Sequence, residues 1–210
     1  GSSLTLFAAR ASKVASIGSF QPISRETFLL LNNLLLGTAA AAVLLGTLYP
    51  LIIDALHLGK LSVGPPYFNA VIVPLMAPVM LLMVVGTYVR WKGDTWNNLV
   101  RKLGGIAALA LALGCTAPVL AGRWSALVAM GLSLAFWIIL SSAADIVRQV
   151  RNTPRLRSTP WSFWGMHLAH VGIAVTAIGI TMVKGYETER DVRMSMGDTV
   201  AVGTYTLKLT

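Results

Sequence analysis

Five long apolar stretches constrain the fold of this chain more than any other feature. They cover approximately residues 27–49, 67–89, 103–121, 126–144 and 163–183. A helix needs about 20 mostly apolar residues to cross the hydrocarbon layer of a membrane, so each stretch is long enough to span it. Charged residues form only 12% of the chain, against roughly a quarter in soluble domains. The sequence therefore predicts an all-α polytopic membrane protein with about five spanning helices.

The two ends of the chain depart from this pattern. Residues 1–183 are predicted to form the transmembrane region, and the first of them, up to Arg10, have the composition of the last turns of an earlier membrane helix. In residues 184–210, Val, Thr and Tyr favour strands. The expected strands are residues 191–196 and 199–209, on either side of a turn at Gly197 and Asp198. Two or three strands are marginal in water, so the tail is predicted to be the incomplete start of a small outer-side β domain.

Lys and Arg residues are unevenly distributed among the connections between the helices. Successive connections, beginning before the first helix, carry three, one, four, one and four of them. Cytoplasmic connections are enriched in these residues, so the alternation predicts a cytoplasmic N-terminal segment. In a diderm bacterium the chain would then lie in the inner membrane, with its C-terminal tail in the periplasm. The net charge of +9 does not predict nucleic-acid binding, because the basic residues form short clusters between apolar stretches.

Local signals predict where some helices begin, end and pack. Ser24 is expected to cap the first helix and Pro50 to end it. The third and fourth helices are joined by only a few residues, so they are expected to pack as an antiparallel pair. Asn32 and Asn33 are expected to form hydrogen bonds with neighbouring helices. His57 is expected in a solvated connection on the outer side.

The fifth stretch contains two histidines near the start of its predicted helix. At about 100° per residue, His167 and His170 share a face with Ala174 and Ala177, whose small side chains predict a slot above His170 for a flat, bulky ligand. His170 lies deeper, roughly 10 Å along the helix from Phe163, whereas His167 is nearer the cytoplasmic interface. Another face carries small residues suited to tight helix packing, namely Gly165, Ala169, Gly172, Thr176 and Gly179.

Several interpretations of these histidines are compatible with their spacing. A neutral imidazole beside an apolar slot is suited to ligate haem iron, and two histidines three residues apart can share a small metal ion, although no third ligand is visible. In other interpretations His170 lines a proton or substrate path, or only hydrogen-bonds a neighbouring helix. The single cysteine excludes a Cys-x-x-Cys-His motif, so the chain is not itself a c-type cytochrome.

Six motifs, in this order, make the chain resemble the C-terminal part of the CcmF family, the membrane subunit of the bacterial cytochrome c haem lyase. The motifs are SRET at 24–27, LLLNN at 29–33, LGTLYP at 45–50, SVGPPYFN at 62–69, LAH at 168–170 and ERDVRM at 189–194. They are distributed over most of the chain, which makes the resemblance specific.

The resemblance implies a protein that receives haem from the haem chaperone CcmE and joins it to the Cys-x-x-Cys-His thiols of apocytochrome c, with CcmH-type subunits presenting the apoprotein. It also implies a b-type haem within the membrane, ligated by one histidine from each of two helices. His170 matches the second of these ligands, and His167 does not clearly match the pattern. The family's tryptophan-rich haem-handling segment and the first ligand of the membrane haem are expected upstream of Gly1. No catalytic residue of haem transfer is therefore assigned to this chain.

Two functions of other classes remain alternatives at this stage. In one, the chain is a transporter or permease module whose kinked second helix and His170 line a path for protons or a substrate. In the other, it is a structural membrane subunit that docks a partner through its outer tail. A b-type haem spectrum of the purified protein separates the haem lyase from both.

Overall fold

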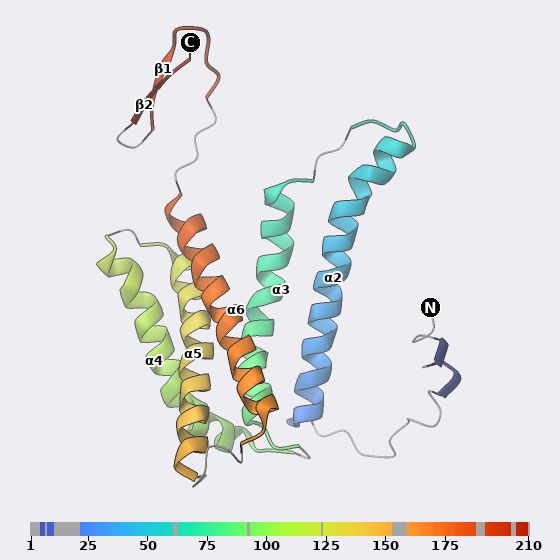
Figure 1. The fold of residues 1–210 in the computed structure, drawn as a ribbon, viewed down its shortest axis with the longest axis vertical. Coiled ribbons are helices and arrows are strands. Elements are labelled where there is room, and N and C mark those ends of the chain that lie inside the picture. The colour runs from blue at the N-terminus through green and yellow to red at the C-terminus, as the bar shows by residue number, and fades with distance from the viewer. Residues whose placement is uncertain are drawn as a thin grey trace.

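The structure is a computed structural model, and among the residues that it describes five helices are long and apolar enough to span a membrane (Figure 1). The described residues are 5–6, 8–10, 22–60, 63–91, 93–122, 124–152, 159–187, 192–202 and 205–209. With the labels of Figure 1, the helices are α2 (Arg25–Ala55), α3 (Pro65–Tyr88), α4 (Trp96–Leu120), α5 (Ala126–Asn152) and α6 (Trp161–Tyr186). The predicted fold class, a polytopic helical membrane protein with a small β element, is confirmed.

Helix α2 begins where the sequence predicted but continues further than expected. The Ser24 hydroxyl accepts a hydrogen bond from the Thr27 amide at 3.2 Å, so Ser24 is the N-cap. The prediction that Pro50 ends the helix is wrong, because α2 runs through Pro50 to Ala55. Proline is tolerated inside membrane helices, where neighbouring helices and local adjustments satisfy the freed backbone groups. Pro74 and Pro78 likewise lie inside α3.

Helix α5 forms the centre of the bundle. It contacts α3, α4 and α6, and its Ala135 and Ile138 have no exposed surface. The predicted antiparallel pairing of the third and fourth helices is present, with α4 and α5 side by side (Figure 1). A Cβ atom added to Gly114 of α4 would lie 2.5 Å from the backbone nitrogen of Ser133 in α5. The two backbones therefore pack as closely as only glycine permits.

Helix α2 is the least buried of the spanning helices. It packs along α3, where the Tyr67 hydroxyl donates a hydrogen bond to the Ala42 carbonyl at 3.1 Å. Leu30 and Leu34 are 60% and 65% exposed, as expected for side chains that face lipid or another helix. Within the described residues Asn32 Oδ1 has no hydrogen-bond partner, so the expected interhelical bond from this group is absent there.

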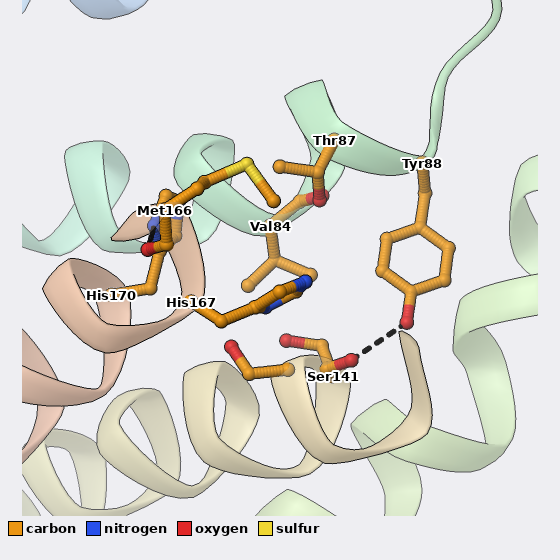
Figure 2. Close-up of a pocket in the computed structure, with 8 residues that line it drawn as sticks. Val84, Thr87, Tyr88, Ser141, Met166, His167 and His170 are labelled. Atoms are coloured by element: carbon orange, nitrogen blue, oxygen red, sulfur yellow. Dashed lines mark hydrogen bonds between the residues drawn. The ribbon is translucent and has the colours of Figure 1, made fainter. Parts of the chain in front are cut away.

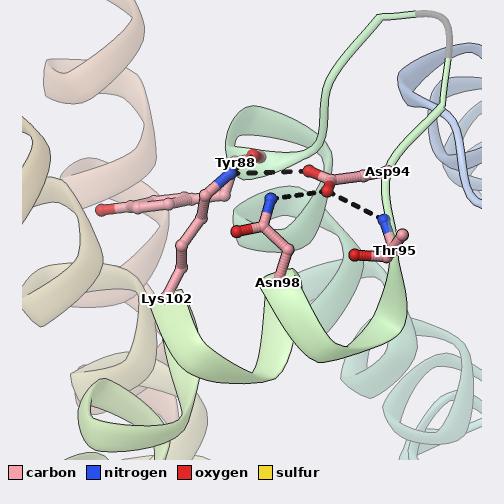
Figure 3. Close-up of polar contacts among 5 residues, drawn as sticks. All are labelled: Tyr88, Asp94, Thr95, Asn98 and Lys102. Atoms are coloured by element: carbon pink, nitrogen blue, oxygen red, sulfur yellow. Dashed lines mark hydrogen bonds and ion pairs between the residues drawn. The ribbon is translucent and has the colours of Figure 1, made fainter.

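The connection between α3 and α4 is held by Asp94 (Figure 3). Its carboxylate accepts hydrogen bonds from the Asn98 side-chain amide at 2.6 Å and the Thr95 backbone amide at 2.9 Å, and it lies 3.5 Å from the Lys102 ammonium group. These contacts, the Asn98 bond first, lower the pKa of Asp94 from 3.8 to about 2. The Asp94 backbone amide also donates to the Ile23 carbonyl at 2.8 Å, which ties this connection to the start of α2.

The C-terminal tail contains one antiparallel hairpin, β1 (Thr199–Val202) paired with β2 (Tyr205–Lys208). The expected strand before the turn is wrong in its described part, because residues 192–196 are not a strand. Instead, the residues after the turn at Gly197 form both strands. Gly197 has a φ of 97°, which favours glycine, and its amide donates to the Leu209 carbonyl at 2.8 Å. The division of the chain into a helical region and an incomplete β domain stays a prediction.

Candidate functional site

Both histidines of α6 line one small pocket where α3, α5 and α6 meet (Figure 2). Its volume is about 10 Å³. The lining residues are Val84, Thr87 and Tyr88 from α3, Ser141 and Ser142 from α5, and Met166, His167 and His170 from α6. The lining residues of α3 and α6 lie near the end of α3 and near the start of α6, and these helix ends carry the α3–α4 and α5–α6 connections. The structure thus adds hydroxyl groups from two other helices to the histidine pair found in the sequence.

His170 has one ring nitrogen in use and one free for a ligand. Its Nδ1 lies 2.7 Å from the carbonyl oxygen of Met166, one turn earlier in α6. A carbonyl can only accept a hydrogen bond, so Nδ1 is the donor in this contact, and in the neutral ring the lone pair lies on Nε2. A bond from one ring nitrogen to a carbonyl is the usual way in which proteins orient a metal-ligating histidine. The side chain is partly exposed. His170 therefore has the tautomer and access that an iron ligand needs.

His167 is the more enclosed of the two histidines. Its side chain is 6% exposed, and its Nε2 lies 3.3 Å from the Asp145 carboxylate of α5. Its ring also packs edge-on against Phe163, with the ring centres 4.4 Å apart. Among the described residues, however, no group reaches either ring nitrogen with hydrogen-bond geometry. His170 lies one turn further along α6, but His167 is more completely surrounded by protein.

Tyr88 and Asp145 belong to the surroundings of the site, and the sequence analysis missed both. The Tyr88 hydroxyl donates a hydrogen bond to the Ser141 carbonyl at 2.8 Å, and the Arg148 guanidinium lies 5.5 Å from the centre of the Tyr88 ring. Asp145 follows directly after the predicted end of the fourth helix at residue 144. An ionisable residue within a spanning helix is a functional candidate, so a longer estimate of this helix would have drawn attention to Asp145.

The face of α6 that was expected to form a slot is covered largely by the chain itself. Ala174 has no exposed surface, and Ala177 is partly buried against the same core. Contact of a ligand with Ala174 would therefore require α6 to move away from its neighbours. Ala177 and the partly exposed side of His170 are the accessible part of this face. The slot at Ala174 and Ala177 stays a prediction.

The small-residue stripe of α6 does not pack against the described helices, contrary to the expectation from sequence. A Cβ atom added to Gly165, Gly172 or Gly179 would have no atom within 4 Å. Close approach to α5 occurs on the other side, where Gly185 meets Val128 and Gly131 of α5 meets Thr181. Spacing alone identified a surface that permits close packing, but the contact lies elsewhere.

Two remaining expectations concern other ligands and His57. The described residues contain no group of three or more His, Cys, Asp or Glu side chains placed to hold a metal ion. A metal shared by His167 and His170 would thus need a ligand from elsewhere. His57 follows the end of α2, has a φ of 53°, and is exposed, which agrees with a solvated connection.

These observations define a class of protein: a multi-pass membrane protein with a histidine pocket at one end of its bundle. The comparisons then identify the relatives. The chain is 48% identical over 208 residues to the cytochrome c-type biogenesis protein CcmF of Pseudomonas aeruginosa, and 44% identical over 208 residues to CcmF of Escherichia coli K12. Both matches cover 98% of this chain but only 32% and 31% of the relatives. The chain thus spans about a third of the length of these relatives.

A solved structure agrees with the sequence comparison. The structure named cytochrome c heme lyase CcmF superposes with a TM-score of 0.65 at 27% identity, covering 96% of this chain and 32% of that one. No family model matches the chain. The predicted resemblance to the CcmF family is therefore confirmed over nearly the whole chain, and a match to a third of each relative is consistent with the predicted C-terminal portion.

Proposed function

We propose that this chain is a membrane part of a cytochrome c haem lyase, and that it helps to attach haem to apocytochrome c. The names of its relatives support this function and give no support to a permease. A haem chaperone of the CcmE type would deliver the haem, and CcmH-type subunits would present the apocytochrome. Because the chain spans about a third of these relatives, the residues that carry out haem transfer are proposed to lie in the remaining part of the protein.

The chain's own contribution is proposed to be His170, which would hold the iron of a membrane-embedded b haem. The observation that carries this proposal is the 2.7 Å contact between His170 Nδ1 and the Met166 carbonyl, which leaves Nε2 as the free donor atom. When bound, such a haem would supply one-electron redox chemistry. A second histidine that holds the iron would come from outside the described residues.

The other residues around His170 would orient its ring and close the site on one side. The Met166 carbonyl fixes the tautomer, and the buried Ala174 lets α6 lie close to its neighbours in the bundle core. Ala177, which is partly exposed and lies about two turns beyond His170 along α6, would make room for the porphyrin. The aromatic contact of His167 with Phe163 keeps the less accessible histidine away from this role.

We further propose that the chain lies in the inner membrane with the histidine pocket near the cytoplasmic side. Basic residues gather around the helix ends and connections at that end, namely Arg25, Arg90, Arg101, Lys102, Arg148 and Arg151. Among the described residues of the opposite end, Lys60 and Lys184 are the basic ones between α2 and α3 and at the end of α6. This asymmetry supports a cytoplasmic pocket and a periplasmic hairpin.

The reduced-minus-oxidised absorbance spectrum of the complete purified protein tests the haem assignment. We expect His170→Ala to abolish the b-haem signal, because it removes the donor atom. His167→Ala is the matched control, since it alters the same helix and pocket three residues away, and it should retain the signal. A normal b-haem content after loss of His170 would contradict the assignment. Loss of the signal only in His167→Ala would transfer the role to His167.

A further inference from the structure

The imidazole of His167 is a buried polar group with one ring nitrogen left unpartnered. Its side chain is 6% exposed and its Nε2 lies 3.3 Å from the Asp145 carboxylate, but within the described residues Nδ1 has no hydrogen-bond partner. The large majority of buried side-chain polar atoms in proteins have a partner, which is either protein or ordered water. An exception beside a cavity therefore indicates that the cavity contributes the partner.

The cavity next to His167 has the size and the lining for one water molecule. Its volume is about 10 Å³, close to the minimum of roughly 10–15 Å³ that one water needs. The Thr87 hydroxyl donates to the Val84 carbonyl at 2.7 Å, and the Ser141 hydroxyl donates to the Ile138 carbonyl at 3.0 Å. Each hydroxyl uses its proton in this way and keeps lone pairs that accept. A water molecule needs two to four polar partners, and the lining offers a ring nitrogen and these oxygens.

We propose that this cavity is a hydration site, in which one ordered water molecule binds between the His167 ring and the hydroxyl groups of Thr87 and Ser141. Asp145 completes the arrangement, because its carboxylate is 28% exposed and lies 3.3 Å from Nε2 of the same ring. The Asp145 carboxylate and the His167 imidazole thus form a polar chain from the protein surface to the water, which lies beside His170. The site is formed by this chain's own side chains and does not depend on bound haem.

Radiolytic hydroxyl-radical labelling of the complete protein in detergent tests the proposal. Radicals formed from a bound water oxidise the side chains around it, and a thioether is readily converted to the sulfoxide. The Met166 side chain lines the cavity and reports on it. Met80, which is 8% exposed and lies in the apolar core, is the buried control, and Met196, 88% exposed, measures the radical dose. We expect Met166 oxidation, scaled to Met196, to exceed that of Met80. Because Met166 is also partly exposed to solvent, the part of this signal that comes from the bound water is the part that is lost in cavity variants.

Variants connect the signal to the proposed partners. His167→Phe fills the space without a ring nitrogen, and Ser141→Ala removes one acceptor with little change of volume. Both should lower Met166 oxidation severalfold, whereas His57→Phe, in the connection after α2, should leave it unchanged. Met166 oxidation no higher than that of Met80, or equal in the wild type and both cavity variants, would overturn the proposal. The haem spectrum of His170→Ala tests His170 ligation in a separate experiment, so the two proposals can fail independently.

Discussion

Two sets of glycines in the bundle differ in what surrounds them: one set lies against neighbouring helices and the other faces open space. Gly114 of α4 and Gly131 of α5 lie against neighbouring helices so closely that an added Cβ would overlap them. Gly165, Gly172 and Gly179 form a regular stripe along α6, and an added Cβ there would touch no described atom. The sequence predicts close helix packing at the regular stripe, but in the structure the close packing occurs at the isolated glycines. Small residues show that close approach is permitted, but they do not specify which face is packed.

The largest effect in this comparison is expected at Gly114. In Gly114→Ala the new methyl group would lie 2.5 Å from the Ser133 nitrogen and 2.6 Å from its Cα, both backbone atoms that cannot rotate away. Helix α4 must then move from α5, so we expect stability to fall by about 1–3 kcal/mol, the usual cost of overpacking. Thermal unfolding of the complete protein in detergent measures the change.

Gly105→Ala is the matched control, because Gly105 lies in the same helix with no atom within 4 Å of an added Cβ. It should be neutral or stabilising by up to about 1 kcal/mol, since alanine is the better helix former. Equal losses at Gly105 and Gly114 would show that the packed and open positions do not differ.

A smaller effect is expected from the stripe itself. Gly172→Ala adds a methyl group to an open surface of α6, so we expect stability to be unchanged or raised by less than about 1 kcal/mol. The same thermal unfolding experiment applies. A loss of stability as large as that of Gly114→Ala would mean that another part of the complete protein covers the stripe. The glycines of the stripe would then be packed positions, as Gly114 is.

The sequence was sufficient for the spanning helices but not for the pocket. Hydropathy predicts the five helices because the membrane requires long apolar segments whatever their tertiary contacts. Hydropathy underestimates how far the helices extend. The predicted fourth helix stops just before Asp145, whereas α5 continues through polar residues to Asn152. Tyr88, Ser141 and His167 come together only through the packing of three helices, and no local pattern encodes that packing. His170 was identified because a histidine in a spanning helix is itself unusual.

The Asp94 cluster gives the smallest effect, and it extends the comparison to a polar contact outside the spanning segments. The pKa of Asp94 is about 2 in the folded protein, below its ordinary value of 3.8. The folded state therefore favours the carboxylate, and this contribution is complete above about pH 4 and disappears as the pH falls toward 2. In Asp94→Asn the loss of stability between these pH values should be less steep than in the wild type, as measured by unfolding at a series of pH values.

Asp198→Asn, on the exposed turn before the hairpin, is the control and should keep the wild-type slope in the helical transition. Parallel pH profiles of the wild type and Asp94→Asn would mean that the contacts with Asn98 and Lys102 do not hold the connection between α3 and α4 in the complete protein.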